Sequence, residues 1–375
     1  MVHKDNDCWQ ATLTLTQNTT ILVCIDSWRD AFGTWLVELR KRIEGYLLAP
    51  FGVDEGAELL CRAVEIATGA DLQHLSTVLE GLRTANTLLA AWEAVQDPTP
   101  AGLVSRWLPR SDMVTSATLQ ISVDRPRALY STWYEMFPRS QGRELGKPAT
   151  LRQAAERLPA LRAMGFDVVY LPPIHPVGLT HRKGPNNSLI AGPNDPGSPW
   201  AIGNAAGGHM TVDPGLGNLS DFDAFVATAA EEGMEVALDF AVQCSPDYPW
   251  VREHPDWFKY RPDGSIKYAE NLPKKYQDVY PLDFDTHDQE SLWRALLEVL
   301  TFWISHKVKI FRVDNPHTKP FAFWKWLIAE VQRQWPEVIF LSESFTSPNV
   351  AKLLAKLGFT QSYTYFTWLN HAKEL

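Results

Sequence analysis

Two acidic residues follow predicted β-strands closely enough to act on one ligand. The segment Lys309–Val313 predicts a strand that leads to Asp314, and Val338–Ser342 predicts a strand that leads to Glu343. Residues two apart lie on the same side of a strand, so Arg312 stands beside Asp314 and favours its ionised form, which suits a nucleophile. A structural ion pair between Arg312 and Asp314 is the alternative interpretation.

A pair of carboxylates is what glycoside chemistry needs. One attacks the anomeric carbon, while the other protonates the leaving oxygen and later deprotonates the acceptor. A double displacement with retention follows when the two groups lie about 5–5.5 Å apart. A third predicted strand, Glu235–Phe240, adds Asp239 and the amide of Gln243 to the same rim. The alternative interpretation is that each of these two is an ordinary polar residue of the rim.

Short β-rich runs alternate with amphipathic segments beyond about residue 110. The predicted strands are Ala128–Tyr134, Val168–Leu171, Glu235–Phe240, Lys309–Val313, Val338–Ser342 and a sixth near Ser362–Phe366. Helices are predicted around residues 150–163, 221–232, 289–305, 320–334 and 348–357. This βα series predicts an α/β fold, a parallel (β/α)₈ TIM-type barrel with functional residues at the carboxyl ends of its strands. Only six strands fit before Leu375, so the barrel is expected to be incomplete at its C-terminal end.

The first 110 residues predict smaller elements. Alternation in Trp9–Leu15 and Thr20–Cys24 predicts two short strands, which cannot form a stable sheet alone. Helical periodicity from Trp28 to about Pro100 predicts a small bundle of three helices. The proline-bearing stretch Asp97–Pro109 predicts a connector to the barrel.

Composition narrows the class of partner. The formal charge of -9 argues against nucleic acid or an anionic membrane as the main partner, because phosphate binding needs clustered Lys and Arg. The polar start MVHKDNDCWQ is not a signal peptide, and no apolar run approaches the roughly 18 residues of a membrane span. A cytoplasmic protein is expected. The four cysteines show no CxxC spacing, so neither zinc nor a disulfide framework is predicted, and nothing demands a metal or an organic cofactor.

Several longer motifs resemble the α-1,4-glucan:maltose-1-phosphate maltosyltransferases of the α-amylase superfamily. In that superfamily the third strand carries an Asp, the fourth Arg-x-Asp and the fifth a Glu, the order of Asp239, Arg312, Asp314 and Glu343. The segments similar to the maltosyltransferase branch are Trp133–Ser140, Leu171–Gly178, His181–Asn187, Gly197–Trp200, Leu238–Phe240, Gln243–Asp247, Lys274–Asp278 and Phe311–Lys319. The resemblance covers nearly the whole chain.

The resemblance implies three regions. Residues 1–27 are similar to the end of the family's N-terminal β-sandwich, and residues 28–110 to its helical insertion, which suggests a homodimer. Residues 111–375 are similar to strands one to about six of the catalytic barrel.

The resemblance also implies roles. Asp314 is expected to attack C1 of a maltosyl donor, and Glu343 to protonate the departing phosphate and then activate the 4-hydroxyl of an acceptor glucan. Donor-binding positions of the family fall on Lys183, Gln243, Asp278 and Asn315. The positions similar to the phosphate-contacting set are Ser198, Asn271, Lys274 and Tyr276, which supply hydroxyl, amide and ammonium donors. On its own, the pair Lys274–Lys275 is more typical of a solvated loop.

The chain departs from the family pattern in places. The superfamily's third catalytic carboxylate and the family's later Lys-Tyr donor contact would lie beyond Leu375, and Leu369 stands where the family has Arg. A barrel without its closing strands has unpaired edges, so weak folding or weak activity is expected. Two alternatives to the transferase stay open: an inactive relative that only binds glucan or a partner chain, and an α-amylase-type hydrolase or trehalose-interconverting enzyme.

Overall fold

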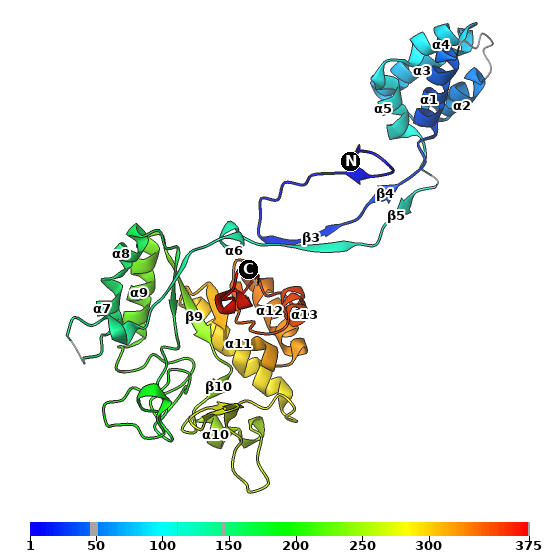
Figure 1. Cartoon of the computed structure of the whole chain (residues 1–375). Helices are drawn as coiled ribbons and strands as arrows, with labels where there is room; N and C mark the ends of the chain where they lie inside the picture. Colours follow the sequence, from blue (N-terminus) through cyan, green and yellow to red (C-terminus); the bar gives the residue numbers. More distant parts are fainter. Residues whose placement is uncertain (46–51, 111, 145–146, 374–375) are drawn as a thin grey trace. The chain divides into compact units, whose positions relative to one another are not determined.

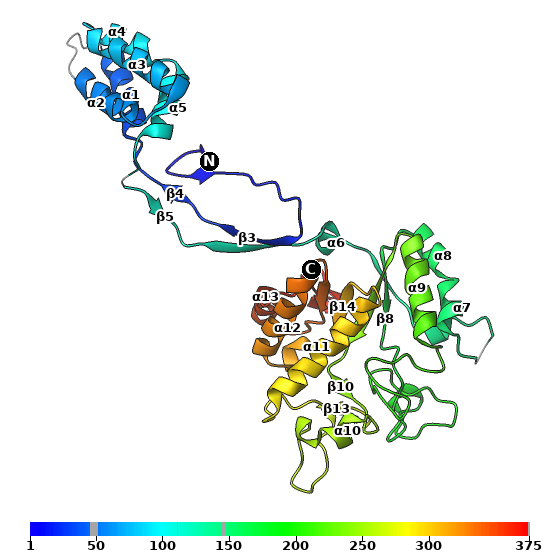
Figure 2. The same ribbon diagram turned by 180° about the vertical axis from the view of Figure 1, so that it is seen from behind.

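The computed structural model describes residues 1–45, 52–110, 112–144 and 147–373. These residues form two compact units (Figures 1 and 2). One unit comprises Met1–Thr19 and Ser122–Leu375, and the other comprises Thr20–Ile121. Each unit is described by itself below.

Six parallel strands make the sheet of the larger unit. In spatial order they are β16 (Gln361–Ser362), β15 (Ile339–Ser342), β14 (Ile310–Val313), β9 (Glu235–Phe240), β8 (Val168–Leu171) and β7 (Trp133–Glu135). Every residue of β8, β14 and β15 is buried, as expected where both faces of a parallel sheet are covered. The sheet is a curled, partial (β/α)₈ barrel.

Helices cover the outer face of this sheet. They are α7 (Leu151–Ala155), α8 (Leu158–Ala163), α9 (Leu219–Glu231), α11 (Gln289–Ser305), α12 (Phe321–Gln334) and α13 (Pro348–Lys356). In Figures 1 and 2, α7, α8 and α9 lie together, and α11, α12 and α13 form a second group. The start of α9 is fixed by a capping box in which Asn218 and Asp221 exchange hydrogen bonds.

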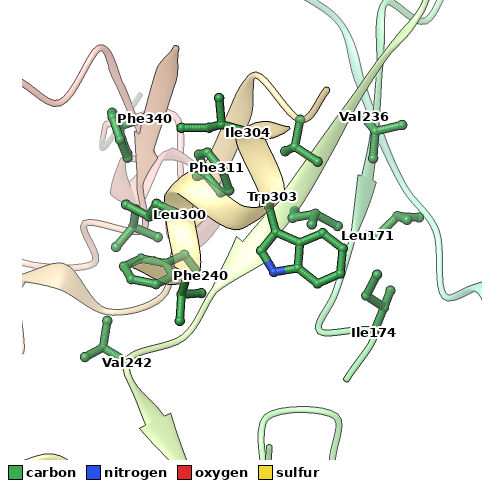
Figure 3. Close-up of a cluster of buried hydrophobic side chains, with 14 of the residues drawn as sticks. Leu171, Ile174, Val236, Phe240, Val242, Leu300, Trp303, Ile304, Phe311 and Phe340 are labelled. Atoms are coloured by element: carbon green, nitrogen blue, oxygen red, sulfur yellow. The ribbon is translucent and has the colours of Figure 1, made fainter. Parts of the chain in front are cut away.

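The core between sheet and helices is built from aromatic and branched side chains. Figure 3 shows Trp303 of α11 beside Leu171 and Ile174, with Phe311 and Phe340 on neighbouring strands. The indole of Trp303 is 2% exposed and donates a 2.7 Å hydrogen bond to the carbonyl of His209. This core fixes the strands that carry the candidate site.

The inner face of the sheet holds a second layer. Its apolar members are Trp133, Val168, Tyr170, Ala237, Ile310 and Ile339 from alternate positions of the strands, together with Ala128, which precedes β7. A cavity of about 750 Å³ lies on the same side, lined among others by Trp133, Glu135, Tyr170 and Tyr363. Side chains pointing inward from neighbouring strands therefore meet in the barrel interior.

The smaller unit is a helical bundle joined to short strand pairs. Its helices are α1 (Ala31–Glu44), α2 (Val53–Val64), α3 (Gly69–Thr84), α4 (Leu88–Val95) and α5 (Pro98–Trp107). Their buried faces share one core that includes Trp35, Leu60, Leu75, Leu82 and Val104. Strands β3 (Thr19–Val23) and β6 (Leu119–Val123) pair, as do β4 (Asp26–Ser27) and β5 (Val114–Thr115).

The prediction of three helices before Pro100 was wrong, because the described residues of this region form five. Thr87 caps α4 by accepting from the backbone of Ala90, which separates α4 from α3. Asp97 caps α5, and Pro98 occupies its first position, where a missing N–H costs nothing. The stretch Asp97–Pro109, predicted to be a connector, is therefore mostly helix.

Three strand predictions also need correction. Within Ala128–Tyr134 the chain forms the end of a short helix, α6 (Pro126–Leu129), because Pro126 favours a first helical turn, and only the last residues enter β7. Near Ser362–Phe366 the strand ends at Ser362. Within Trp9–Leu15 only Trp9–Gln10 (β2) is a strand, paired with β1 (Val2–His3). Among the described residues before Pro126 all sheets are two-stranded, so a β-sandwich remnant over residues 1–27 stays a prediction.

Candidate active site

Three neighbouring strands bring acidic side chains to one end of the sheet. Strand β14 lies between β9 and β15, and Arg312 is in register with Asp239 on one side and Leu341 on the other. Asp314 follows β14 and Glu343 follows β15. Since all three strands are parallel, these residues meet at their carboxyl ends, where barrel enzymes place their sites.

Arg312 is the centre of this cluster, which we call the carboxylate cluster (Asp239, Arg312, Asp314 and Glu343). Its Nη1 atom donates to Asp239 Oδ2 at 2.9 Å and to Asp314 Oδ1 at 2.8 Å. Its Nη2 atom contacts Glu343 Oε1. The arginine side chain is only 9% exposed, so these ion pairs are formed away from water. The sequence prediction that Arg312 stands beside Asp314 is thus matched by a direct contact.

Burial changes the protonation of the cluster. It raises the pKa of Glu343 to about 7, with the Arg312 charge opposing the rise and the Asp314 charge adding to it. Burial likewise raises the pKa of Asp239 to about 7, against the pull of Arg312. For Arg312 burial acts to lower the pKa, but the surrounding negative charges raise it above its ordinary value. The guanidinium therefore stays charged while Glu343 can hold a proton near neutral pH.

The turn after β14 completes the arrangement. Asn315 adopts a left-handed conformation with φ of 42°, which Asn tolerates better than most residues. This conformation lets the Asn315 backbone N–H donate to Glu343 Oε2 at 3.1 Å. The turn is anchored by Trp324, whose indole donates to the carbonyl of Pro316 at 2.8 Å. Asn315 thereby links the acid after β15 to the chain after β14.

A second polar group, the Lys183–Asp278 cluster (Lys183, Gln277 and Asp278), differs in being incompletely paired. Lys183 is 5% exposed and donates to Gln277 Oε1 and to the carbonyl of Lys275. Asp278 is 2% exposed, and neither of its carboxylate oxygens has a hydrogen-bond partner among the described residues. Burial raises the pKa of Asp278, while the charge of Lys183 opposes the rise. Hydroxyl groups of a ligand would satisfy these oxygens.

The predicted phosphate contacts are only partly brought together. Asn271 and Lys274 face each other across the hairpin of β11 (Ala269–Asn271) and β12 (Lys274–Tyr276), and both are exposed. Tyr276 is half-buried against an apolar group that includes Val177. Among the described residues, no hydrogen bond connects Ser198 with this hairpin. Gln243 lies directly after β9 in the short strand β10 (Gln243–Cys244), which pairs with Tyr280–Pro281 (β13).

Comparison with known proteins agrees with the motifs. Residues 1–125 match a family model described as "Alpha-1,4-glucan:maltose-1-phosphate maltosyltransferase, domain N/S". A maltosyltransferase of this description from Chlorobaculum tepidum is 46% identical over 377 residues, which cover 100% of this chain and 56% of that protein. Maltosyltransferase 1 of Streptomyces coelicolor is 49% identical over 371 residues, covering 98% of this chain and 55% of that protein.

The chain belongs to the α-1,4-glucan:maltose-1-phosphate maltosyltransferase family. It spans about half the length of the curated relatives that it matches. Among solved structures, an α-amylase from Lactobacillus plantarum is similar with a TM-score of 0.50 and 27% identity, over 64% of this chain and 53% of the α-amylase. A maltogenic α-amylase from Thermotoga neapolitana is similar with the same TM-score and identity, over 64% of this chain and 50% of that enzyme.

Four residues at the carboxylate cluster were not predicted as site residues from the sequence. Tyr170 of β8 donates to Asp239, and the ring of Tyr363 lies 5.9 Å from the Arg312 guanidinium. His317, three residues after Asp314, has a buried Nδ1 that lacks a partner among the described residues. Burial lowers the pKa of Lys319, while the negative charges of Asp314 and Glu343 oppose this change. For Tyr170 a signal existed, because it is a polar residue at the end of a buried strand.

The described residues show no group of three metal-ligating side chains suited to an ion. No described helix is long and apolar enough to cross a membrane. All four cysteines are free thiols.

Proposed function

We propose that this chain carries the nucleophile and the acid/base of a retaining maltosyltransferase, which moves maltose from α-maltose 1-phosphate to the non-reducing end of α-1,4-glucans. The observation that carries the proposal is Arg312, which holds Asp314 and Glu343 on its two terminal nitrogens. Because the two carboxylates bind the two terminal nitrogens of one guanidinium, they lie near each other, which supports the short carboxylate separation of a retaining enzyme. Retention is therefore favoured.

In the first step an oxygen of Asp314 forms a bond to C1 of the maltosyl group. The bond from C1 to the phosphate oxygen breaks, and the departing oxygen takes the proton of Glu343. The raised pKa of Glu343, about 7, supports this role because the group can hold a proton near neutral pH. The products are a β-maltosyl-enzyme and inorganic phosphate.

In the second step Glu343, now ionised, takes the proton of the acceptor's 4-hydroxyl. The hydroxyl oxygen forms the new bond to C1, and the ester to Asp314 breaks. Two inversions give an α product and return Glu343 to its protonated form. Both steps, as written, use only carboxylates and a fixed guanidinium, so the proposal includes no cofactor.

The donor would be held by residues around this pair. Lys183, Gln243, Asp278 and Asn315 are proposed to bind the sugar, with the unpaired oxygens of Asp278 supporting that assignment. Ser198, Asn271, Lys274 and Tyr276 are proposed to bind the phosphate. Asp239 is fully buried against Arg312, which supports a role in holding the guanidinium. A contact of Asp239 with the sugar is proposed as well.

The test is release of inorganic phosphate from maltose 1-phosphate with maltohexaose as acceptor, for the wild type and for Asp314→Ala. Phosphate release that falls at least about a thousandfold in the variant is the expected result. Hydrolysis of glucan without any dependence on maltose 1-phosphate would indicate an amylase-type enzyme instead. A folded chain that releases nothing would reject the transferase and leave a glucan-binding relative. A homodimer and a cytoplasmic location are also proposals, the first checked by sedimentation equilibrium and the second by cell fractionation.

A further inference from the structure

We propose that Tyr170 is a positioning residue, which orients Arg312 for both catalytic carboxylates by fixing the side chain of Asp239. The inference rests on the function proposed above for Asp314 and Glu343, because it explains how their shared guanidinium is held. Tyr170 does not touch the reacting atoms in this assignment. It acts through two hydrogen bonds in series.

The geometry of Asp239 is the first reason. Its Oδ2 atom accepts from both the Tyr170 hydroxyl and Arg312 Nη1, while Oδ1 is buried and has no partner among the described residues. The Asp239 side chain is 0% exposed, so water does not compete for it. In the described part of the chain, Tyr170 is thus the one neutral donor to Asp239. Without it, only Arg312 would determine the orientation of this carboxylate.

The geometry of Arg312 is the second reason. Its Nη1 atom has two hydrogens, and both are used, one by Asp239 and one by Asp314. A rotation of Asp239 would therefore move the hydrogen that Asp314 receives, and Glu343 on Nη2 would move with it. Tyr170 is itself held rigidly, since it is 3% exposed and its strand pairs with β9. The Tyr170 hydroxyl therefore has a fixed position, which orients Asp239 and, through it, Arg312 of the carboxylate cluster.

Charge gives the interaction a signature that packing alone lacks. The Tyr170 hydroxyl donates to Asp239 and so favours the ionised form of this carboxyl over the neutral form. The other titratable groups that face Asp239 or Tyr170 from the packed elements are Arg312, Asp314, Glu343 and Glu135. Removing the hydroxyl should raise the pKa of Asp239. A neutral Asp239 no longer repels the ionised form of Glu343 and no longer shares the charge of Arg312 with it. The pKa of Glu343 should therefore fall.

The experiment compares the wild type with Tyr170→Phe, which removes one oxygen and keeps the ring. Urea unfolding of the whole chain is measured from pH 5 to pH 8.5. Relative to the wild type, the folded-to-unfolded ratio of the variant should fall by about a further threefold to tenfold between pH 5 and pH 8.5. The reason is that the lost hydrogen bond matters most when Asp239 is ionised. In an Asp239→Asn background the effect of Tyr170→Phe should become independent of pH. Tyr134→Phe is the matched control, since that ring packs edge-on against Phe166, and it should show no pH-dependent deficit.

Two results would overturn the proposal. One is a deficit that stays constant from pH 5 to pH 8.5, which is what lost packing would give. The other concerns the pH profile of phosphate release in an active chain. We expect Tyr170→Phe to shift the alkaline limb of this profile toward lower pH by about half a unit or more, and an unshifted limb would overturn the proposal. If the wild type releases no phosphate, the proposed function fails on its own, and the unfolding comparison still decides whether Tyr170 fixes Asp239.

Discussion

The two polar clusters of the barrel unit are both buried but differ in how completely they are paired. In the carboxylate cluster each acidic side chain contacts Arg312. In the Lys183–Asp278 cluster the lysine has partners, while both oxygens of Asp278 have none among the described residues. A buried charge with a fixed partner stabilises one geometry, whereas a buried charge without one raises the energy of the empty protein until a ligand satisfies it. The first arrangement suits bond making, and the second suits ligand binding.

Replacement of Arg312 by Met should have the largest effect on this comparison. It leaves three carboxyl groups in a buried site without their cation, so the free energy of unfolding at pH 7 should fall by about 3–5 kcal/mol. The loss should be smaller at pH 5, where the carboxyl groups are protonated more easily. Urea unfolding at the two pH values measures both effects.

The matched control is Arg162→Met, because Arg162 pairs with Asp167 at 3.2 Å on a side chain that is 43% exposed. An exposed pair of this kind is worth about 0–1 kcal/mol. Equal losses for Arg312→Met and Arg162→Met would mean that the carboxylate cluster is not the rigid, paired site described above.

The pH dependence of stability gives the next effect. The pKa of Glu343 rises from 4.5 to about 7 on folding, so the folded state binds a proton more tightly than the unfolded state. Stability should therefore fall as pH rises from 5 to 7, and Glu343→Gln should remove about 2–3 kcal/mol of that fall. The measurement is urea unfolding of both proteins across this range. The control is Glu231→Gln, on the exposed face of α9, which should show the same pH dependence of stability as the wild type. If Glu343→Gln also kept the wild-type change of stability with pH, Glu343 would not be protonated in the folded chain.

Asp278→Asn should affect ligand affinity more than stability, the reverse of what is expected for Arg312→Met. Removing an unpaired buried charge should leave the free energy of unfolding at pH 7 unchanged or higher, in contrast to Arg312→Met. Affinity for maltose 1-phosphate, measured by calorimetry, should fall by about 10–100-fold because hydrogen bonds to a charged group are lost. Asp256→Asn, at an exposed position, serves as the control. A destabilised Asp278→Asn variant with normal affinity would assign Asp278 to the fold instead of to the ligand.

The sequence predicted the inner strands well and the helical unit less well, for a physical reason. Strands β8, β9, β14 and β15 are short apolar runs buried on both faces, so composition alone marks them within a residue or so. The helical unit is divided by single capping residues such as Thr87 and Asp97, and a hydrophobic period does not register these. Periodicity therefore merged helices that the caps separate.

For the site, the sequence predicted the residues on one strand better than the contacts between strands. The spacing of Arg312 and Asp314 follows from the period of a strand, and their contact is found. The contact of Tyr170 with Asp239 depends on the register between β8 and β9, which no local pattern contains. The same holds for Asp278, whose burial is a tertiary property.

The contact between β16 and α6 has a consequence for the order of folding. Gln361 of β16 donates a 2.8 Å hydrogen bond to the carbonyl of Ala128 in α6, 233 residues earlier in the sequence. A contact of such sequence separation carries a large loop-closure entropy and forms late unless other strands have already aligned the ends. During synthesis from the N-terminus, α6 is exposed long before Gln361 exists. We therefore expect the pairing of strands β7 to β15 to precede this contact, and the carboxylate cluster to form before Gln361 reaches Ala128.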